Sequence, residues 1–180
     1  MPKFGLTLSP DRLIDEGAGL VNTWGQQFAV PAVGEKGHYD LAITVETLGG
    51  HSSVPPPHTG IGYLAMLVAQ MEANPHKPML TTASPLYGFV TCAAAHAHDM
   101  PKDLKKLVLK SATGDQGAMD DLPELMIKTG MGGTPPGPGQ GDPLRSMLIT
   151  TQATDLISGG LKVNALVCCL ALLADLYAPS

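Results

Sequence analysis

The chain has 180 residues, of which 44% are hydrophobic and 15% are charged, and its formal net charge is −5. This composition is typical of one folded domain with a sizeable core, and the length leaves little room for a second one. The acidic balance and the lack of a long Lys and Arg run argue against nucleic acid as a partner.

The first segment, residues 1–26, is predicted to be a connector. Five charged side chains lie between Lys3 and Glu16, so no apolar stretch of signal-peptide length fits there. We therefore expect no secretory leader in this chain, and its location stays open. The polar turn at Glu16-Gly17 precedes the apolar residues 28–33, which favour a short strand.

Residues 39–48 form the clearest strand pattern, because apolar and polar side chains alternate there with the period of a half-buried strand. The sequence Gly49-Gly50-His51-Ser52-Ser53 ends this strand. Three prolines, Pro55 to Pro57, then keep the loop extended, since proline fixes φ and cannot donate a hydrogen bond. Apolar residues recur from Ile61 to Met71 at helical spacing, which predicts a helix that ends near Asn74-Pro75.

Residues 84–129 are predicted to be a helical insertion. Ser84-Pro85 favours a helix start, because serine caps free amides and proline fits the first helical position. A second helix is expected from Met100-Pro101, and a third over residues 120–128. The following residues 131–143 are rich in Gly and Pro, which indicates an irregular loop.

The last part of the chain is predicted to contain a hairpin and an apolar tail. Residues 147–157 favour a strand, Gly159-Gly160 permits a tight turn, and residues 161–165 favour a second short strand. The apolar run 166–176 is too short for a membrane span, which needs about 20 residues, and we expect it to be a buried helix. The three cysteines, Cys92, Cys168 and Cys169, suggest no disulfide framework.

Two motifs in this order resemble a known family. The first is Gly49-Gly50-His51-Ser52-Ser53 with its proline loop, and the second is Gly-Gly-Leu-Lys-Val-Asn-Ala-Leu over residues 159–166. With Glu35-Lys36-Gly37 and Asp40 before them, they resemble the lid domain of the zinc exopeptidases that include aminoacylase and glutamate carboxypeptidase. The likeness spans residues 13–166 and is strongest to the branch of the vacuolar carboxypeptidase S.

The resemblance implies an α+β fold, with an antiparallel sheet covered by helices on one face. It implies a ferredoxin-like lid or dimerisation domain over residues 27–166, which carries the helical insertion at 84–129. Residues 167–180 depart from the family pattern and are expected to be an atypical apolar tail, as in a truncated, mis-spliced or frame-shifted product. By the resemblance, relatives are vacuolar or cytoplasmic.

The resemblance also implies the roles of three residues. His51 is expected to help hold the scissile carbonyl oxygen, across a dimer or a closing cleft, as an oxyanion donor on a rigid loop. Asn164 and Gly160 are expected to contact the end of the substrate that carries the carboxylate, because an amide donates hydrogen bonds without adding charge.

The zinc ligands of the family are not found in this sequence. The resemblance places them on a catalytic domain with two zinc ions, whose general base is the first residue of a Glu-Glu pair, and no such pair occurs here. His38-Tyr39-Asp40 has His-x-Asp spacing, but no further ligand is visible from the sequence. His96 and His98 would lie about 200° apart on a helix. We therefore expect no metal on this chain.

The sequence leads to one main functional hypothesis and two alternatives. The main one is a lid fragment, inactive alone, of a zinc-dependent metallo-carboxypeptidase or aminoacylase-like hydrolase of peptide or N-acyl amino-acid amide bonds. Its partners would be a second copy, as a homodimer, or the missing catalytic domain. The first alternative is a non-catalytic interaction module that pairs with a full-length relative. The second is an unrelated metalloenzyme that uses His38, Asp40, His96 or His98.

Overall fold

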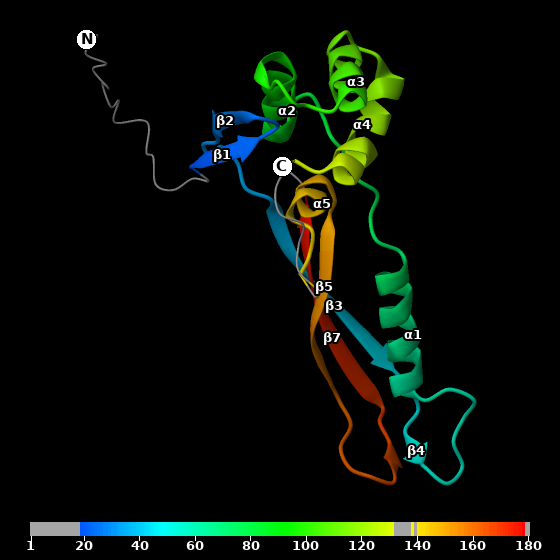
Figure 1. The fold of residues 1–180 in the computed structure, drawn as a ribbon. Helices are drawn as coiled ribbons and strands as arrows, with labels where there is room; N and C mark the ends of the chain where they lie inside the picture. The colour runs from blue at the N-terminus through cyan, green and yellow to red at the C-terminus, as the bar shows by residue number, and fades with distance from the viewer. Residues whose placement is uncertain (1–18, 132–137, 139, 179–180) are drawn as a thin grey trace.

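The computed structural model describes residues 19–131, 138 and 140–178. Figure 1 shows a long sheet with a helix beside it and a helical layer at one end. Most of the expected connector lies outside the described residues. Its last part forms strand β1 (Leu20–Thr23), which pairs in antiparallel fashion with β2 (Gln26–Ala29). The expected strand at 28–33 thus starts earlier and ends before Pro31, which has no amide hydrogen to donate.

The main sheet is antiparallel and has three strands, β3 (Gly37–Glu46), β7 (Cys169–Ala178) and β5 (Thr151–Gly159), in the order β3-β7-β5. All of β3 is paired with β7, from Gly37 opposite Ala178 to Glu46 opposite Cys169. The α+β class is therefore confirmed. The ferredoxin-like arrangement stays a prediction.

The apolar run 166–176 does not form a helix, so that prediction is wrong. Most of it belongs to β7, the middle strand of the sheet, and what was expected to be a tail is central to the fold. Alternate residues of β7 are buried: Leu170, Leu172, Ala174 and Leu176. A middle strand satisfies its amide and carbonyl groups on both sides, which a helix would do internally.

The predicted second strand at 161–165 is also corrected. Only Ala165–Leu166 is extended, as β6, and it pairs with β4 (Gly50–His51). Residues 160–164 instead form the loop that joins β5 to β6. Gly160 has φ 88° and Asn164 has φ 69°, a left-handed conformation that interrupts a strand.

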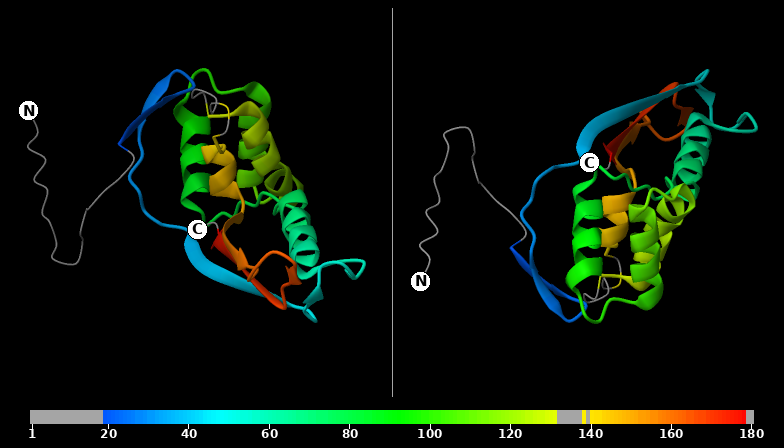
Figure 2. Two further views of the ribbon diagram at one scale, coloured as in Figure 1. Left: turned by 90° about the horizontal axis from the view of Figure 1, so that it is seen from below. Right: turned by 90° about the horizontal axis from the view of Figure 1, so that it is seen from above.

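Helix α1 (Gly60–Ala73) lies along the sheet, as the further views in Figure 2 also show. The Thr59 side chain caps it by accepting a hydrogen bond of 3.1 Å from the Gly62 amide. Leu64 is the most deeply buried side chain of the helix and packs in one cluster with Val167, Leu170 and Leu172. This cluster joins the helix to the sheet, and the predicted helix is confirmed.

The helical layer contains α2 (Pro85–His96), α3 (Lys102–Ala112), α4 (Gln116–Thr129) and α5 (Pro143–Leu148). The three helices expected over residues 84–129 are observed, although the third begins earlier, where the Asp115 side chain accepts from the Ala118 amide. That they form an insertion stays a prediction. Helix α5 was not predicted, and β5 therefore starts at Thr151 rather than 147. The layer has its own core with the β1–β2 hairpin. None of the helices in the described ranges is long and apolar enough to cross a membrane.

Lys36 connects the helical layer to the sheet. Its Nζ donates to the carbonyl oxygens of Ser146 (2.9 Å) and Ile149 (3.1 Å), and to the Thr151 hydroxyl (3.0 Å). The ammonium group thus satisfies free carbonyls at the end of α5. Burial lowers the pKa of Lys36 below its ordinary value. This side chain fixes the start of β3 against α5 and β5.

We expect Leu64→Ala to lower the free energy of unfolding by about 3 kcal/mol, because it leaves a cavity between α1 and the sheet. Leu64 is 1% exposed, whereas Leu109 on α3 is 53% exposed. Leu109→Ala is the matched control and should change stability by less than about 0.5 kcal/mol. Urea denaturation followed by circular dichroism measures both, and equal losses would contradict the packing of α1.

Candidate functional site

His51 and Asn164 lie side by side, although 113 positions separate them in the sequence. The Asn164 Nδ2 and the His51 Nε2 are 3.3 Å apart. The β4–β6 pairing causes this contact, because His51 is opposite Ala165 and Asn164 is the preceding residue. The two motifs that were predicted to supply a site therefore meet at one end of the sheet. Their roles in substrate binding stay predictions.

The ring of His51 is held by Ser53. The backbone amide of Ser53 donates to His51 Nδ1 at 3.2 Å, and the Ser53 hydroxyl lies 2.7 Å from the same nitrogen. A backbone amide can only donate, so a neutral ring must carry its proton on Nε2. Nε2–H then faces Asn164, whose side-chain oxygen is the group that can accept from it. Amide oxygen and nitrogen are interchangeable by a half-turn of the side chain.

The approach of the two loops depends on Thr47 and Gly49. The Thr47 amide donates to the Cys168 carbonyl at 2.7 Å, and the Thr47 hydroxyl donates to the Val167 carbonyl at 2.9 Å. A Cβ at Gly49 would lie 3.2 Å from the Leu166 carbonyl oxygen, closer than ordinary contact. The glycine therefore permits the close approach that the β4–β6 pairing needs.

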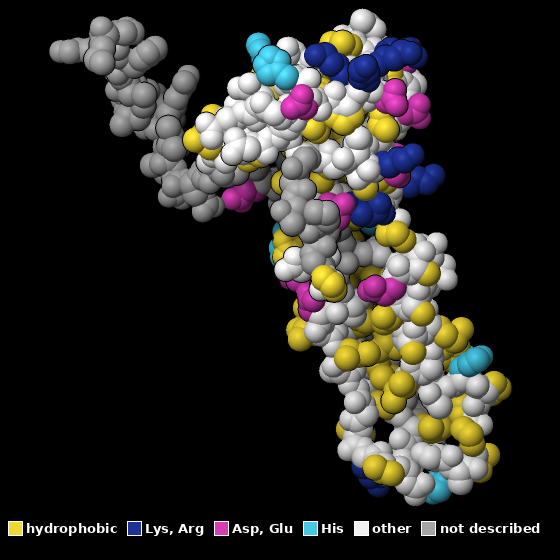
Figure 3. All heavy atoms as spheres, viewed as in Figure 1, with side chains coloured by type: hydrophobic (Ala, Val, Ile, Leu, Met, Phe, Trp, Pro, Cys, Tyr) yellow, Lys and Arg dark blue, Asp and Glu magenta, His cyan; other side chains and the backbone are white. Residues whose placement is uncertain are grey.

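The surroundings of His51 are open. His51 and Asn164 are both exposed, and so are Gly160 and the apolar side chains of Val54 and Val163. Apolar and polar groups thus share one exposed end of the molecule, which the space-filling view shows below the helical layer (Figure 3). An exposed imidazole and amide can donate to a ligand that a second surface delivers, but they do not enclose one.

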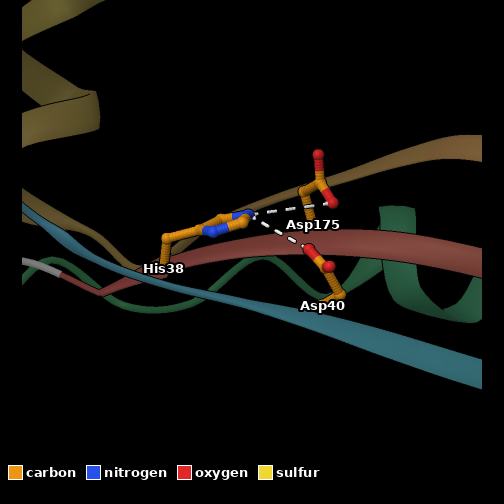
Figure 4. A group of neighbouring side chains, drawn as sticks. All are labelled: His38, Asp40 and Asp175. Carbon is orange, nitrogen blue, oxygen red and sulfur yellow. Dashed lines mark ion pairs between the residues drawn. The ribbon is translucent and has the colours of Figure 1, made fainter.

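A second group of polar side chains lies on the other part of the sheet. His38, Asp40 and Asp175 bring one ligand atom each to within 4.8 Å of one another, the one such group of three among the described residues. His38 Nε2 is 3.1 Å from Asp40 Oδ1 and 3.9 Å from Asp175 Oδ1 (Figure 4). His96 and His98 do not take part in such a group.

Neighbouring strands produce this second group. His38 and Asp40 share a face of β3 because they are two residues apart, and Asp40 is directly opposite Asp175 on β7. Asp155 on β5 lies where the register shifts between Thr154 and Leu156. Hydrogen bonding to Asp155, then partial burial and hydrogen bonding to Asp40, raise the pKa of Asp175 above its ordinary value. No third ligand for His38 and Asp40 was predicted from the sequence, because Asp175 was expected to lie on a helix.

Comparisons with known proteins find full-length relatives. No family model matches the chain, and no solved structure matches it. Carboxypeptidase S of Saccharomyces cerevisiae is 39% identical over 155 residues, which cover 86% of this chain and 25% of that protein. An uncharacterized carboxypeptidase of Schizosaccharomyces pombe is 37% identical over 154 residues, again 86% of this chain and 23% of the relative.

A third relative carries a different name. The N-fatty-acyl-amino acid synthase/hydrolase PM20D1 of Bos taurus is 29% identical over 158 residues, which are 86% of this chain and 27% of that protein. The chain therefore spans about a quarter of the length of the curated relatives it matches.

We expect Asp175→Asn to raise the melting temperature at pH 7 in buffer that contains a chelator. A carboxyl whose pKa is raised by folding stabilises the folded state only while protonated, and this contribution is lost as the pH rises through the folded pKa. Below the ordinary Asp pKa of about 3.9 the gain should disappear. Differential scanning fluorimetry across this range measures it, with Asp121→Asn on α4 as control. If Asp175→Asn lowered the melting temperature at pH 7, repulsion between the neighbouring carboxylates would be contradicted.

Proposed function

Because the chain belongs to the carboxypeptidase S family, we propose that it is the lid or dimerisation part of a zinc-dependent hydrolase of peptide or N-acyl amino-acid amide bonds. The contact of 3.3 Å between His51 and Asn164 carries this proposal. It brings the polar residues of two distant motifs to one exposed place, where they can meet a substrate together.

The proposed role of His51 is to donate a hydrogen bond from Nε2 to the carbonyl oxygen of the bond that is cleaved. That oxygen gains negative charge as a nucleophile adds, so a donor already in place lowers the barrier. The contacts of Ser53 with Nδ1 support this role, because they leave the proton on Nε2 without rotating the ring. Ser53 is thus a positioning residue for His51.

The proposed role of Asn164 is to bind the carboxylate end of the substrate. In the structure Nδ2 is the Asn164 atom next to His51 Nε2. A half-turn of the amide would let its oxygen accept from Nε2–H and leave Nδ2 directed away from the ring, where it can donate to a carboxylate. Gly160, in the same loop, has φ 88° and presents backbone without a side chain. A substrate that inserts between His51 and Asn164 would replace their mutual contact with two new ones.

The zinc of this proposal belongs to another part of the enzyme. The residues of this chain do not fit a centre for two zinc ions, since they include no Glu-Glu pair and, in the described part, one group of three ligand atoms. His51 would therefore act on a substrate bound to a catalytic domain of the same protein or of a partner subunit. The part of this chain would be to bind and orient the substrate and to stabilise the charge on its carbonyl oxygen through His51.

Exposed apolar side chains support a covering partner. On α1, four large apolar residues are 44–57% exposed. They are Ile61, Tyr63, Met66 and Leu67. Leu161 and Val163 are also exposed at the loop that contains Asn164. Such surface is typical of a contact with another domain or subunit, so a catalytic domain or a second copy of the chain is the proposed cover.

The same surface also supports the alternative, a non-catalytic module that pairs with a full-length relative. In that case, His51 and Asn164 would hold the loops together rather than bind a substrate. The two functions differ in what they do to turnover. A lid supplies a group that the reaction needs, whereas a module changes the activity of an enzyme that is already complete.

The catalytic role can be tested in a chimera. This chain is placed in full-length carboxypeptidase S of Saccharomyces cerevisiae instead of the matching quarter, and hydrolysis of an N-acyl amino acid is measured. His51→Ala should lower kcat by about 100- to 1000-fold with little change in KM, the usual effect of losing one oxyanion donor. Asn164→Ala should mainly raise KM.

The control for this test is His58→Ala. His58 is exposed in the loop that follows His51, and its ring contacts Tyr63 at a tilt of 58°, with ring centroids 5.4 Å apart. Its replacement should leave kcat and KM unchanged. Normal kcat in the His51→Ala chimera would rule out the catalytic role. The alternative, an interaction module, is tested by adding the separate chain to the unmodified full-length relative. It requires that the turnover of that enzyme changes.

The isolated chain is expected to associate in solution through its exposed apolar surface. Light scattering should give a mass above that of one chain, and the mass should rise with protein concentration. Met66→Glu on α1 should reduce this association, because it places a charge on the surface that becomes buried. A single-chain mass at high concentration would count against the proposed cover.

A further inference from the structure

The face of the sheet opposite α1 carries an imidazole and three carboxylates from three strands. His38 and Asp40 come from β3, Asp175 from β7 and Asp155 from β5. Figure 4 shows the His38 ring with its Nε2 directed between the carboxylates of Asp40 and Asp175. An imidazole nitrogen among carboxylate oxygens is a mixed donor set, the kind that binds divalent transition metals rather than only Mg²⁺ or Ca²⁺.

We propose that His38, Asp40 and Asp175 bind one divalent transition-metal ion, such as Zn²⁺, with Asp155 beside them as a further carboxylate. This site is separate from the His51–Asn164 pair and does not depend on the proposed function. It holds a single ion on the outer face of a sheet, so its role is to clamp strands rather than to activate water.

The distances between the ligand atoms fit one ion with little movement. In a tetrahedral zinc site, with bonds of 2.0–2.1 Å, neighbouring ligand atoms are about 3.3 Å apart. His38 Nε2 and Asp40 Oδ1 are 3.1 Å apart, and the same nitrogen is 3.9 Å from Asp175 Oδ1. The three ligand atoms all lie within 4.8 Å of one another, so a side-chain rotation that moves the Asp175 carboxylate toward the other two would complete the set.

The backbone around these side chains is already fixed. Asp40 and Asp175 are a cross-strand pair, within a ladder that pairs every residue of β3. His38 is opposite Tyr177, and the two rings are in contact at a tilt of 34°, with centroids 4.6 Å apart. Tyr177 thus limits the rotation of the imidazole. A site built on paired strands loses little backbone freedom when an ion binds.

The charges of the group are unfavourable without a cation. Carboxylates directly opposite each other on neighbouring strands repel, and within the described part of the chain His38 is the basic group that forms ion pairs with them. Asp175 is the most shielded of the three ligands, with 27% of its side chain exposed, against 46% for His38 and 55% for Asp40. A divalent ion would offset this repulsion and join β3 to β7, with β5 adjacent.

The test is a titration of the full chain with Zn²⁺ after treatment with a chelator. Isothermal titration calorimetry should show one Zn²⁺ per chain, and scanning fluorimetry should show a higher melting temperature with Zn²⁺. His38→Ala and Asp175→Asn should each abolish both effects. Asp175→Asn thereby has opposite consequences, since it stabilises the ion-free chain and removes the response to the ion.

Two controls separate this site from other ligands. His76→Ala, at an exposed position after α1, should leave the binding of Zn²⁺ unchanged. His96→Ala should also leave it unchanged, although His96, His98 and Cys92 line a shallow pocket next to α2. The proposal is overturned if no Zn²⁺ binds, if binding survives both His38→Ala and Asp175→Asn, or if Mg²⁺ binds as tightly as Zn²⁺.

Discussion

The pairing of β3 with β7 is the constraint on which the rest of the molecule depends. Its ladder continues through the Thr47 hydrogen bonds into the short β4–β6 pair, so one register places both groups of polar residues. Asp40 meets Asp175 near one end, and His51 meets Asn164 near the other. A shift of one residue would turn Asp175 to the buried face and separate both pairs.

The buried face of β7 stabilises this register. Leu170, Leu172 and Ala174 pack under α1 against Leu64, which makes a shifted strand costly in buried apolar area. Lys36 fixes the other end of the sheet to α5 through hydrogen bonds. The apolar cluster and the ammonium group therefore hold opposite ends of β3, and the polar residues lie on the face that neither occupies.

Local sequence patterns were enough to predict the helices and strands that have one apolar face and one polar face. The alternation from Tyr39 to Glu46 and the helical spacing from Ile61 to Met71 each have one apolar side, and both elements are observed. The prediction for residues 166–176 was wrong because Leu and Ala occupy both faces of β7. A short run that is apolar throughout is equally compatible with a buried helix. Helix α5 was missed although Asp142-Pro143 is a good helix start.

The two groups of polar residues also differed in how far the sequence could predict them. His51 and Asn164 were expected to work together because each lies in a motif of its own, and the structure brings them into contact. Asp175 lies in no motif. Its position beside Asp40 depends on a pairing between distant parts of the chain, which neither composition nor periodicity indicates. Long-range register was therefore the information that the sequence lacked.

The place of β7 in the chain also affects how the protein is made. Of the three strands described here, the middle one is synthesised last, after the whole helical layer. Until residues 169–178 leave the ribosome, β3 and β5 have no partner between them, and their free edges are exposed to other chains. The helical layer, whose contacts are more local, can fold during this time. The free edges of β3 and β5 are thus most exposed to other chains during synthesis, before β7 is in place.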